Sequence, residues 1–100
     1  MLCALTVRKV KPGKSEEFLE KFRPPDDETP GGWQRFYAIR NTADEDEVIT
    51  FGIFDGTLDE LTASQSKDNK YADRVAAVEP LVESTGTRGI FEVLVDQVID

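Results

Sequence analysis

The pattern of apolar and polar positions at the start of the chain predicts a strand followed by a helix. Residues 2–10 are rich in β-branched and apolar side chains with partial alternation, and the Lys-Pro-Gly sequence that follows is typical of a turn. Ser15 can then cap a helix that runs to about Arg23, with two glutamates in its first turn and Phe18, Leu19 and Phe22 on one face. The prolines and glycines of residues 23–32 predict a loop.

Two aromatic and β-branched segments in the middle of the chain predict a hairpin. They are residues 33–40 and 48–54, and the polar stretch 41–47 between them is expected to be the loop, with Asn41 as a turn former. Residues 57–60, Thr-Leu-Asp-Glu, match the capping box, so a helix should begin at Thr57.

The rest of the chain predicts one long helix and a final strand. An apolar stripe interrupted by polar residues indicates a helix that is kinked or broken near Asp68 and ends near Gly86. Residues 90–99 read as a strand with apolar side chains on both faces. The order β-α-β-β-α-β predicts an α+β fold of ferredoxin-like type, in which an antiparallel sheet carries its helices on one face.

The final strand also predicts an oligomer. A sheet that is covered on one side only should alternate apolar with polar residues, whereas residues 90–99 are apolar on both faces. Most homo-oligomers are two-fold symmetric, and monomers rarely expose large apolar patches. We therefore expect a homodimer.

Length and composition bound the class of protein. One hundred residues fit one domain, residues 1–100. The formal net charge of −8, with basic residues scattered along the sequence, disfavours nucleic acid and anionic membranes as partners. The apolar stretches are short and the N-terminus does not resemble a signal peptide, so we expect a cytoplasmic protein.

The chain contains no histidine and a single cysteine, Cys3. These facts disfavour haem, most zinc sites, a His-based catalytic triad and an internal disulfide. The acidic runs 26–28 and 44–47 lack the spacing of a calcium loop and are expected to be solvated loops. We expect no cofactor and predict that the purified protein is colourless and free of metal.

The chain resembles the dimeric α/β-barrel superfamily and, within it, the antibiotic biosynthesis monooxygenase domains. The resemblance rests on the order of elements and on soft patterns in residues 2–7, 11–14, 48–54 and 58–63. It implies two sheets that face each other and a small oxygenase without bound cofactor, acting on a flat aromatic or polyketide-like molecule. The alternatives are a non-catalytic dimer that binds a small ligand or is only structural, and an isomerase or decarboxylase on the same scaffold.

Two departures from the resemblance bear on the site. Many members carry a Trp at the end of the third strand and a His on the second helix, where this chain has Phe54 and Gln65. The departures favour the non-catalytic alternative. Phe54, Gln65 and Asn69, one turn further, are candidate substrate contacts, although the kink near Asp68 could instead expose both amides to water.

One strand combines aromatic bulk with polar ends. Trp33, Arg35 and Tyr37 alternate, so all three side chains are expected on one face. As a pocket wall, Trp33 would contact the substrate while Tyr37 and Arg35 act as catalytic groups on a phenolate, enolate or carboxylate. A Tyr hydroxyl is a weak base near neutral pH, so Arg35 would have to assist.

The pocket is expected to touch the helical face of Leu58, Leu61 and Gln65 as well. Alternatively the two aromatic residues pack against the partner or the loop and Arg35 reaches solvent, as aromatic residues do in ordinary cores and interfaces. A solvent-facing or sealed arrangement would favour the non-catalytic alternative.

Overall fold

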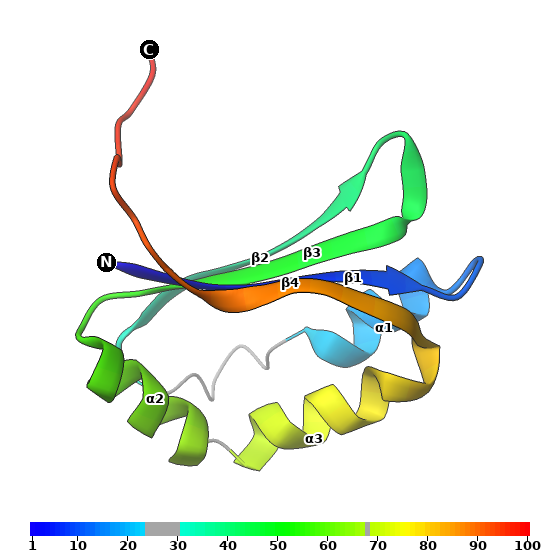
Figure 1. Ribbon diagram of the computed structural model, residues 1–100, viewed down its shortest axis with the longest axis horizontal. Coiled ribbons are helices and arrows are strands. Elements are labelled where there is room, and N and C mark those ends of the chain that lie inside the picture. Colours follow the sequence, from blue (N-terminus) through cyan, green and yellow to red (C-terminus); the bar gives the residue numbers. More distant parts are fainter. Residues whose placement is uncertain (24–30, 68) are drawn as a thin grey trace.

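The computed structural model describes residues 1–23, 31–67 and 69–100, with the side chains of residues 67, 69 and 70 also outside that description. The elements follow the predicted order (Figure 1): β1 (Leu2–Val10), α1 (Ser15–Phe22), β2 (Trp33–Asn41), β3 (Asp44–Phe54), α2 (Leu58–Lys67), α3 (Asn69–Val78), a 3-10 turn (Glu79–Leu81) and β4 (Val82–Glu92).

The four strands form one antiparallel sheet with the order β2-β3-β1-β4. The three α-helices lie on one face of this sheet, and the other face, here called the open face, carries no helix (Figure 1). This confirms the predicted α+β fold of ferredoxin-like type.

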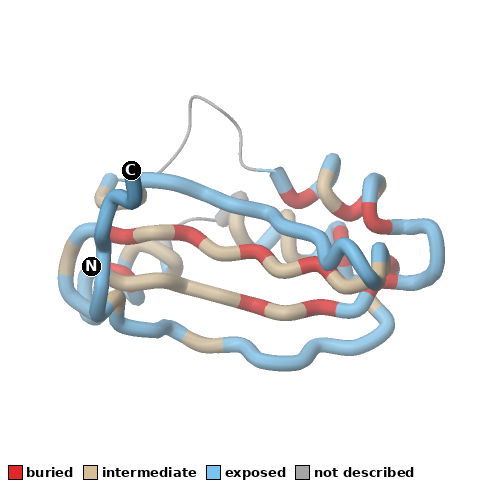
Figure 2. Tube along the Cα trace, turned by 90° about the horizontal axis from the view of Figure 1, so that it is seen from above, coloured by how far each residue is buried: buried red, intermediate tan, exposed pale blue. Residues whose placement is uncertain are grey.

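Alternation along the central strands separates an inner face from the open face. In β1 the buried side chains are Thr6, Arg8 and Val10, and the intervening Leu5 and Val7 are only partly buried. β3 shows the same alternation (Figure 2), whereas the edge strands β2 and β4 are exposed along most of their length. The two central strands therefore support the core.

The core lies between the central strands and helices α1 and α3. Phe18 and Phe22 of α1 stack with their ring centroids 5.4 Å apart. The buried cluster consists of Val10, Phe18, Phe22, Val48, Val78 and Leu81, with Leu19, Tyr71, Val75 and Val82 packed around it. Burying such side chains stabilises the fold by about 1.5–3 kcal/mol each.

The helix boundaries confirm some predictions and correct others. The capping box is present, since Thr57 N donates to Glu60 Oε1 at 3.0 Å and Glu60 N donates to Thr57 Oγ1 at 3.2 Å. The break near residue 68 is confirmed by the separate helices α2 and α3. Ser15 is not the cap. It is the first helical residue, and its hydroxyl accepts a hydrogen bond from Arg40 Nη1 at 3.2 Å.

The end predicted for the second helical segment, near Gly86, is wrong. α3 ends at Val78, and Gly86 lies inside β4. The predicted final strand is therefore misplaced as well: β4 ends at Glu92, and residues 93–100 lie outside the sheet. Residues 90–99 therefore do not form the two-sided apolar strand from which a dimer was predicted, and the homodimer stays a prediction.

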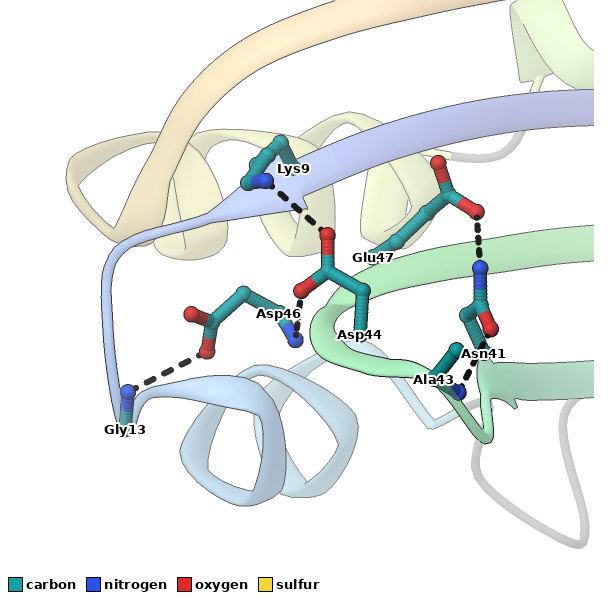
Figure 3. A network of polar contacts seen from close by, with 7 residues as sticks. All are labelled: Lys9, Gly13, Asn41, Ala43, Asp44, Asp46 and Glu47. Carbon is teal, nitrogen blue, oxygen red and sulfur yellow. Dashed lines mark hydrogen bonds and ion pairs between the residues drawn. The ribbon is translucent and has the colours of Figure 1, made fainter.

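The polar stretch of the hairpin is also mostly strand, because residues 44–47 belong to β3. A network of side chains shapes the short turn (Figure 3): Asn41 Oδ1 accepts from Ala43 N at 2.8 Å, and Asp44 Oδ1 accepts from Asp46 N at 3.1 Å. Asn41 is confirmed as a turn former. The predicted loop at residues 23–32 and its acidic run fall largely on residues 24–30, outside the described residues.

Candidate functional site

A β-bulge at the start of β2 separates Trp33 from the other two candidate residues. Trp33 pairs with Phe54 of β3 and Arg35 pairs with Ile53, so β2 advances by two residues where β3 advances by one. The extra residue reverses the alternation at this point. Trp33 consequently shares the inner face with Phe54, whereas Arg35 and Tyr37 lie on the open face. The prediction that all three share one face is wrong.

On the open face, Arg35 and Tyr37 form a layered group with β3. The Tyr37 ring stacks on Phe51 with centroids 4.9 Å apart, and the Arg35 guanidinium carbon lies 5.6 Å from the centroid of the Tyr37 ring. Tyr37 remains 39% exposed. The predicted cavity between Tyr37 and the inner face of α2 is therefore wrong, because the sheet lies between them.

On the inner face, Trp33 ties the sheet to α2. Its Nε1 donates a hydrogen bond to Ser64 Oγ at 3.0 Å, and its ring meets Phe54 edge-on with centroids 5.1 Å apart. Gly52 makes room for the indole, because a Cβ there would lie 2.7 Å from Trp33 Cζ3. Leu61 is fully buried, whereas Leu58, expected on the same face, is 55% exposed.

Of the three remaining candidate residues, two lie near Trp33 and the side chain of the third is outside the described part of the structure. Phe54 is 3% exposed and packs directly against Trp33. Gln65 is partly buried on α2, next to Ser64. The side chain of Asn69 lies outside the described residues. The structure thus brings Trp33 and Phe54 together on the helix side of the sheet and places Arg35 and Tyr37 on the opposite side.

A buried arginine that the sequence analysis did not single out lies on the inner face of β1, near the end of this central strand. Arg8 is 5% exposed, and its Nη1 donates a hydrogen bond to Thr50 Oγ1 at 2.9 Å. Its guanidinium carbon lies 5.5 Å from the ring centroid of Phe18 and 4.8 Å from that of Phe22, which is within cation–π range. In the described part of the chain, no carboxylate lies within 4.0 Å of this group.

Two further arginines surround this position. Arg74 of α3 lies 5.9 Å from the Phe22 ring centroid, and its Nε is buried with no hydrogen-bond partner among residues 1–23, 31–67 and 69–100. Burial lowers the pKa of Arg8, Tyr71 partly offsets that decrease, and the positive charge of Arg88 adds to it. A buried cation without a counter-ion is costly. Within the described residues, the inner face thus carries buried positive charge that no carboxylate pairs with.

A sequence signal for Arg8 did exist. Residues 2–10 alternate, and Arg8 occupies the same parity as Val10. A charged residue at an inward position of an alternating strand is an exception that calls for a partner or a function. Arg74 gave no comparable signal, because the neighbouring helical stripe reads as ordinary core.

The described residues lack two features that would indicate a membrane or a metal. None of their helices is both long and apolar enough to cross a membrane. Nor do they contain a group of three or more Cys, Asp or Glu side chains placed to hold a metal ion. The absence of metal and cofactor in the purified protein stays a prediction.

The fold is shared with solved structures of proteins described as antibiotic biosynthesis monooxygenases. Solved structures match it over nearly the full chain. One is a proposed antibiotic biosynthesis monooxygenase from Chloroflexus aurantiacus, with a TM-score of 0.77, 14% identity, and coverage of 99% of this chain and 98% of that chain. Another, from Nitrosomonas europaea and proposed to have the same activity, has a TM-score of 0.77, 18% identity, and coverage of 95% and 100%.

A third match is SnoaB, a cofactor-independent oxygenase from Streptomyces nogalater. Its TM-score is 0.73, its identity is 14%, and the match covers 95% of this chain and 94% of that chain. No family model and no curated protein sequence matches the chain. The resemblance inferred from the order of elements is therefore confirmed at the level of the fold.

Proposed function

We propose that this protein is a single-domain, homodimeric, cytoplasmic oxygenase without bound cofactor, and that its substrate is a flat aromatic or polyketide-like molecule held between the sheet and the helices. The observation that carries the proposal is the buried Arg8, which lies among aromatic rings without a carboxylate partner in the described residues. The fold shared with a cofactor-independent oxygenase supports the class of reaction.

The chemistry needs little from the protein beyond a dry site and a positive charge. A ring methylene loses a proton to give an enolate or phenolate, and this anion supplies the electrons that reduce O₂. The carbon becomes a carbonyl, one oxygen atom enters the product, and the other leaves as water with the two methylene hydrogens. A guanidinium in a water-poor interior stabilises the anion more than solvent would.

Within this proposal the inner-face residues have separate roles. Arg8 binds the substrate oxygen that carries the negative charge, and Arg74, whose Nε has no hydrogen-bond partner among the described residues, adds a second donor. Trp33, Phe54 and Gln65 would contact only a part of the substrate remote from Arg8, because Phe54 lies six residues along β3 from Val48, which pairs with Arg8. Asn69 keeps its predicted role as a substrate contact.

Arg35 and Tyr37 remain a second candidate catalytic pair. Their position on the open face means that they would act only in a site covered by another molecule, such as a second copy of the chain. Their separation from Trp33 removes the local support that the sequence analysis assigned to them.

The second candidate function is a non-catalytic, dimeric, ligand-binding or structural domain. The dense packing around Arg8 favours it, because Phe18, Phe22 and Thr50 already contact the guanidinium. In that case the arginine is a structural group, satisfied by cation–π contacts and one hydroxyl.

Oxygen uptake with the Arg8→Met variant separates the two functions. Anthrone, a flat tricyclic ketone with an acidic ring methylene, serves as the probe. We expect the wild-type protein to accelerate its oxidation above the buffer rate, and Arg8→Met to lower the rate by at least about tenfold. A Met side chain has a reach similar to that of Arg and needs no hydrogen bond. The free energy of unfolding should therefore fall by no more than about 1 kcal/mol, or it should increase.

Lys9→Met, which removes the neighbouring exposed cation on the opposite face of β1, is the matched control, and it should leave the oxidation rate within about twofold of wild type. Wild-type protein that consumes no oxygen but binds anthrone would favour the ligand-binding function. A large loss of stability in Arg8→Met with unchanged oxidation would make Arg8 structural. A loss of activity in Arg35→Met alone would move the site to the open face.

A further inference from the structure

We infer that the substrate of this protein carries a carboxylate, and that Arg8, Arg74 and Arg88 together bind that carboxylate on the inner face of the sheet. We call these three residues the arginine group. The inference rests on the proposed function, because it names the class of substrate for the same site: a flat aromatic or polyketide-like carboxylic acid.

Three different elements bring the arginine group to one face of the sheet. Arg8 is an inward residue of β1, and its guanidinium carbon lies 4.8 Å from the ring centroid of Phe22. Arg74 of α3 lies 5.9 Å from the same centroid. Arg88 of β4 pairs with Thr6, a buried inward residue of β1. Because directly paired residues of antiparallel strands point to the same face, Arg88 also lies on the inner face.

The arginine group concentrates positive charge in a chain that is acidic as a whole. The chain has a formal net charge of −8 and twelve basic residues. Burial lowers the pKa of Arg8, and the positive charge of Arg88 lowers it further, so these two cations repel each other across the β1–β4 pair. Such convergence of like charges is unfavourable until an anion neutralises them.

No carboxylate of the described residues neutralises the arginine group. Arg8 donates one hydrogen bond, to Thr50, and Arg74 Nε has no partner among residues 1–23, 31–67 and 69–100. A guanidinium has more N–H donors than these contacts use, so donors remain for a ligand. Within the same residues, the cations that lie within 4.0 Å of a carboxylate are Lys9, Lys14, Lys21 and Arg40.

The number of positive charges indicates a ligand that is anionic before the reaction begins. The enolate of the proposed reaction brings one negative charge, and it does so only after the proton has left. A carboxylate next to the reacting oxygen adds a second negative charge, which is present when the substrate binds. It also holds the reacting oxygen in place beside Arg8 while the enolate forms.

The aromatic surroundings favour a carboxylate over a phosphate. Phe18 and Phe22 lie beside Arg8, and Phe22 and Tyr71 lie beside Arg74, with the centroids of Phe22 and Tyr71 6.5 Å apart. A carboxylate on an aromatic ring is planar, matches the flat fork of a guanidinium and extends the aromatic surface. A phosphate is tetrahedral and carries more charge, so its burial among these rings costs more.

Binding of two naphthalene derivatives tests the inference. 2-Naphthoate carries the carboxylate, and 2-naphthamide is a neutral compound of similar shape. Isothermal titration calorimetry at low salt should show 2-naphthoate bound at least about tenfold more tightly than 2-naphthamide. Equal affinities, no detectable binding of 2-naphthoate, or tighter binding of 2-naphthyl phosphate than of 2-naphthoate would overturn the inference.

Variants of the arginine group test where 2-naphthoate binds. Arg8→Met and Arg74→Met should each weaken its binding at least about tenfold. Arg88→Gln, at an exposed position, should weaken it about threefold, and Arg88→Lys, which keeps the charge, should restore it. The control Lys9→Met removes a cation from the opposite face and should leave the affinity within about twofold of wild type. Unchanged affinity in Arg74→Met and Arg88→Gln would contradict the inference, even if Arg8→Met failed to fold.

The outcomes separate this inference from the proposed function. Protein that binds 2-naphthoate through the arginine group but does not oxidise anthrone supports the carboxylate site, in a non-catalytic protein, and contradicts the oxygenase. Anthrone oxidation that depends on Arg8, with 2-naphthoate bound no more tightly than 2-naphthamide, supports the oxygenase and contradicts the carboxylate site.

Discussion

Arg8 and Lys9 are neighbours in β1, yet they lie on opposite faces of the sheet and in opposite electrostatic surroundings. Arg8 lies on the inner face, where burial lowers its pKa. Lys9 lies on the open side, where a hydrogen bond to Asp44 and the charge of that carboxylate raise its pKa (Figure 3). The inner face therefore contains a charged group whose burial is unfavourable. On the open face the charged groups are hydrated or form ion pairs.

The same contrast applies to packing. The inner face contains the buried core, and the open face leaves aromatic and aliphatic side chains partly exposed. If the two faces differ in this way, substitutions of equal size should have unequal effects. The following predictions compare matched positions on the two faces.

The largest expected effect is that of Phe18→Ala. The ring is fully buried between α1 and the sheet, so its removal should lower the free energy of unfolding by about 3–5 kcal/mol. Phe91→Ala on the open face should have a smaller effect, because Phe91 is 45% exposed in the single chain. Urea denaturation followed by circular dichroism measures both.

Protein concentration sharpens this comparison. The loss for Phe18→Ala should be the same at all concentrations, whereas that for Phe91→Ala should vary with concentration if a second copy covers the open face. Equal, concentration-independent losses at the two positions would contradict the proposed difference between the faces.

A methyl group added to each face should have an intermediate effect. Gly52 lies on the inner face, where a Cβ would be 2.7 Å from the Trp33 ring, so Gly52→Ala should cost about 1–3 kcal/mol and shift the tryptophan fluorescence. Gly89 pairs with Leu5, and a Cβ there would meet its nearest atom at 3.5 Å. Gly89→Ala should therefore be neutral or stabilising by up to about 1 kcal/mol. A neutral Gly52→Ala would show that the Trp33 ring can move aside.

The smallest expected effect concerns the Lys9–Asp44 ion pair, with Nζ and Oδ2 2.9 Å apart. Hydrogen bonds from Lys9 and from Asp46 N lower the pKa of Asp44 below its ordinary value of 3.8. The contribution of the ionised Asp44 to stability is therefore complete above pH 3.8, its ordinary pKa. It is lost as the pH falls through the lower pKa that Asp44 has in the folded state. The pKa of Lys9 is raised above 10.5, so its contribution is lost only as the pH rises through that higher value.

Asp44→Asn tests this pair. The variant should melt slightly below wild type near neutral pH, and the difference should shrink as the pH falls from about 5 to about 2. High salt should shrink it as well, since exposed ion pairs are screened. Glu45→Gln, at an exposed neighbouring position, is the control. A difference that grows on acidification would contradict the assignment.

The sequence predicted those parts of the fold where local chemistry and burial agree. The alternation in residues 2–10 matches β1 at both ends, and the capping box at Thr57 is present. Only residues 90–92 of β4 were predicted as strand, because β4 is an exposed edge strand: its side chains are mostly polar, so no apolar alternation marks it, and Gly86 within it resembles a helix end. The apolar residues 93–99 were read as strand instead.

The candidate site was predicted less well, because its geometry depends on pairing between strands. Nothing in the residues around Trp33 signals that β2 contains one residue more than β3 at this point. Strict alternation therefore placed Trp33 with Arg35 and Tyr37. Arg8 could have been recognised from its inward position in the strand. That Arg74 also lies near the Phe22 ring depends on tertiary packing, which the sequence pattern does not reveal.

The bulge has a genetic consequence. Because Gln34 is the surplus residue, a strand without its codon would be regular and would still direct Trp33 inward and Arg35 outward. An insertion or deletion of one residue at this position thus does not change which side chains lie on which face of the sheet. An alignment with a related sequence that lacks the bulge should open a gap of one residue at Gln34, and an ungapped alignment would match inward residues of one protein with outward residues of the other.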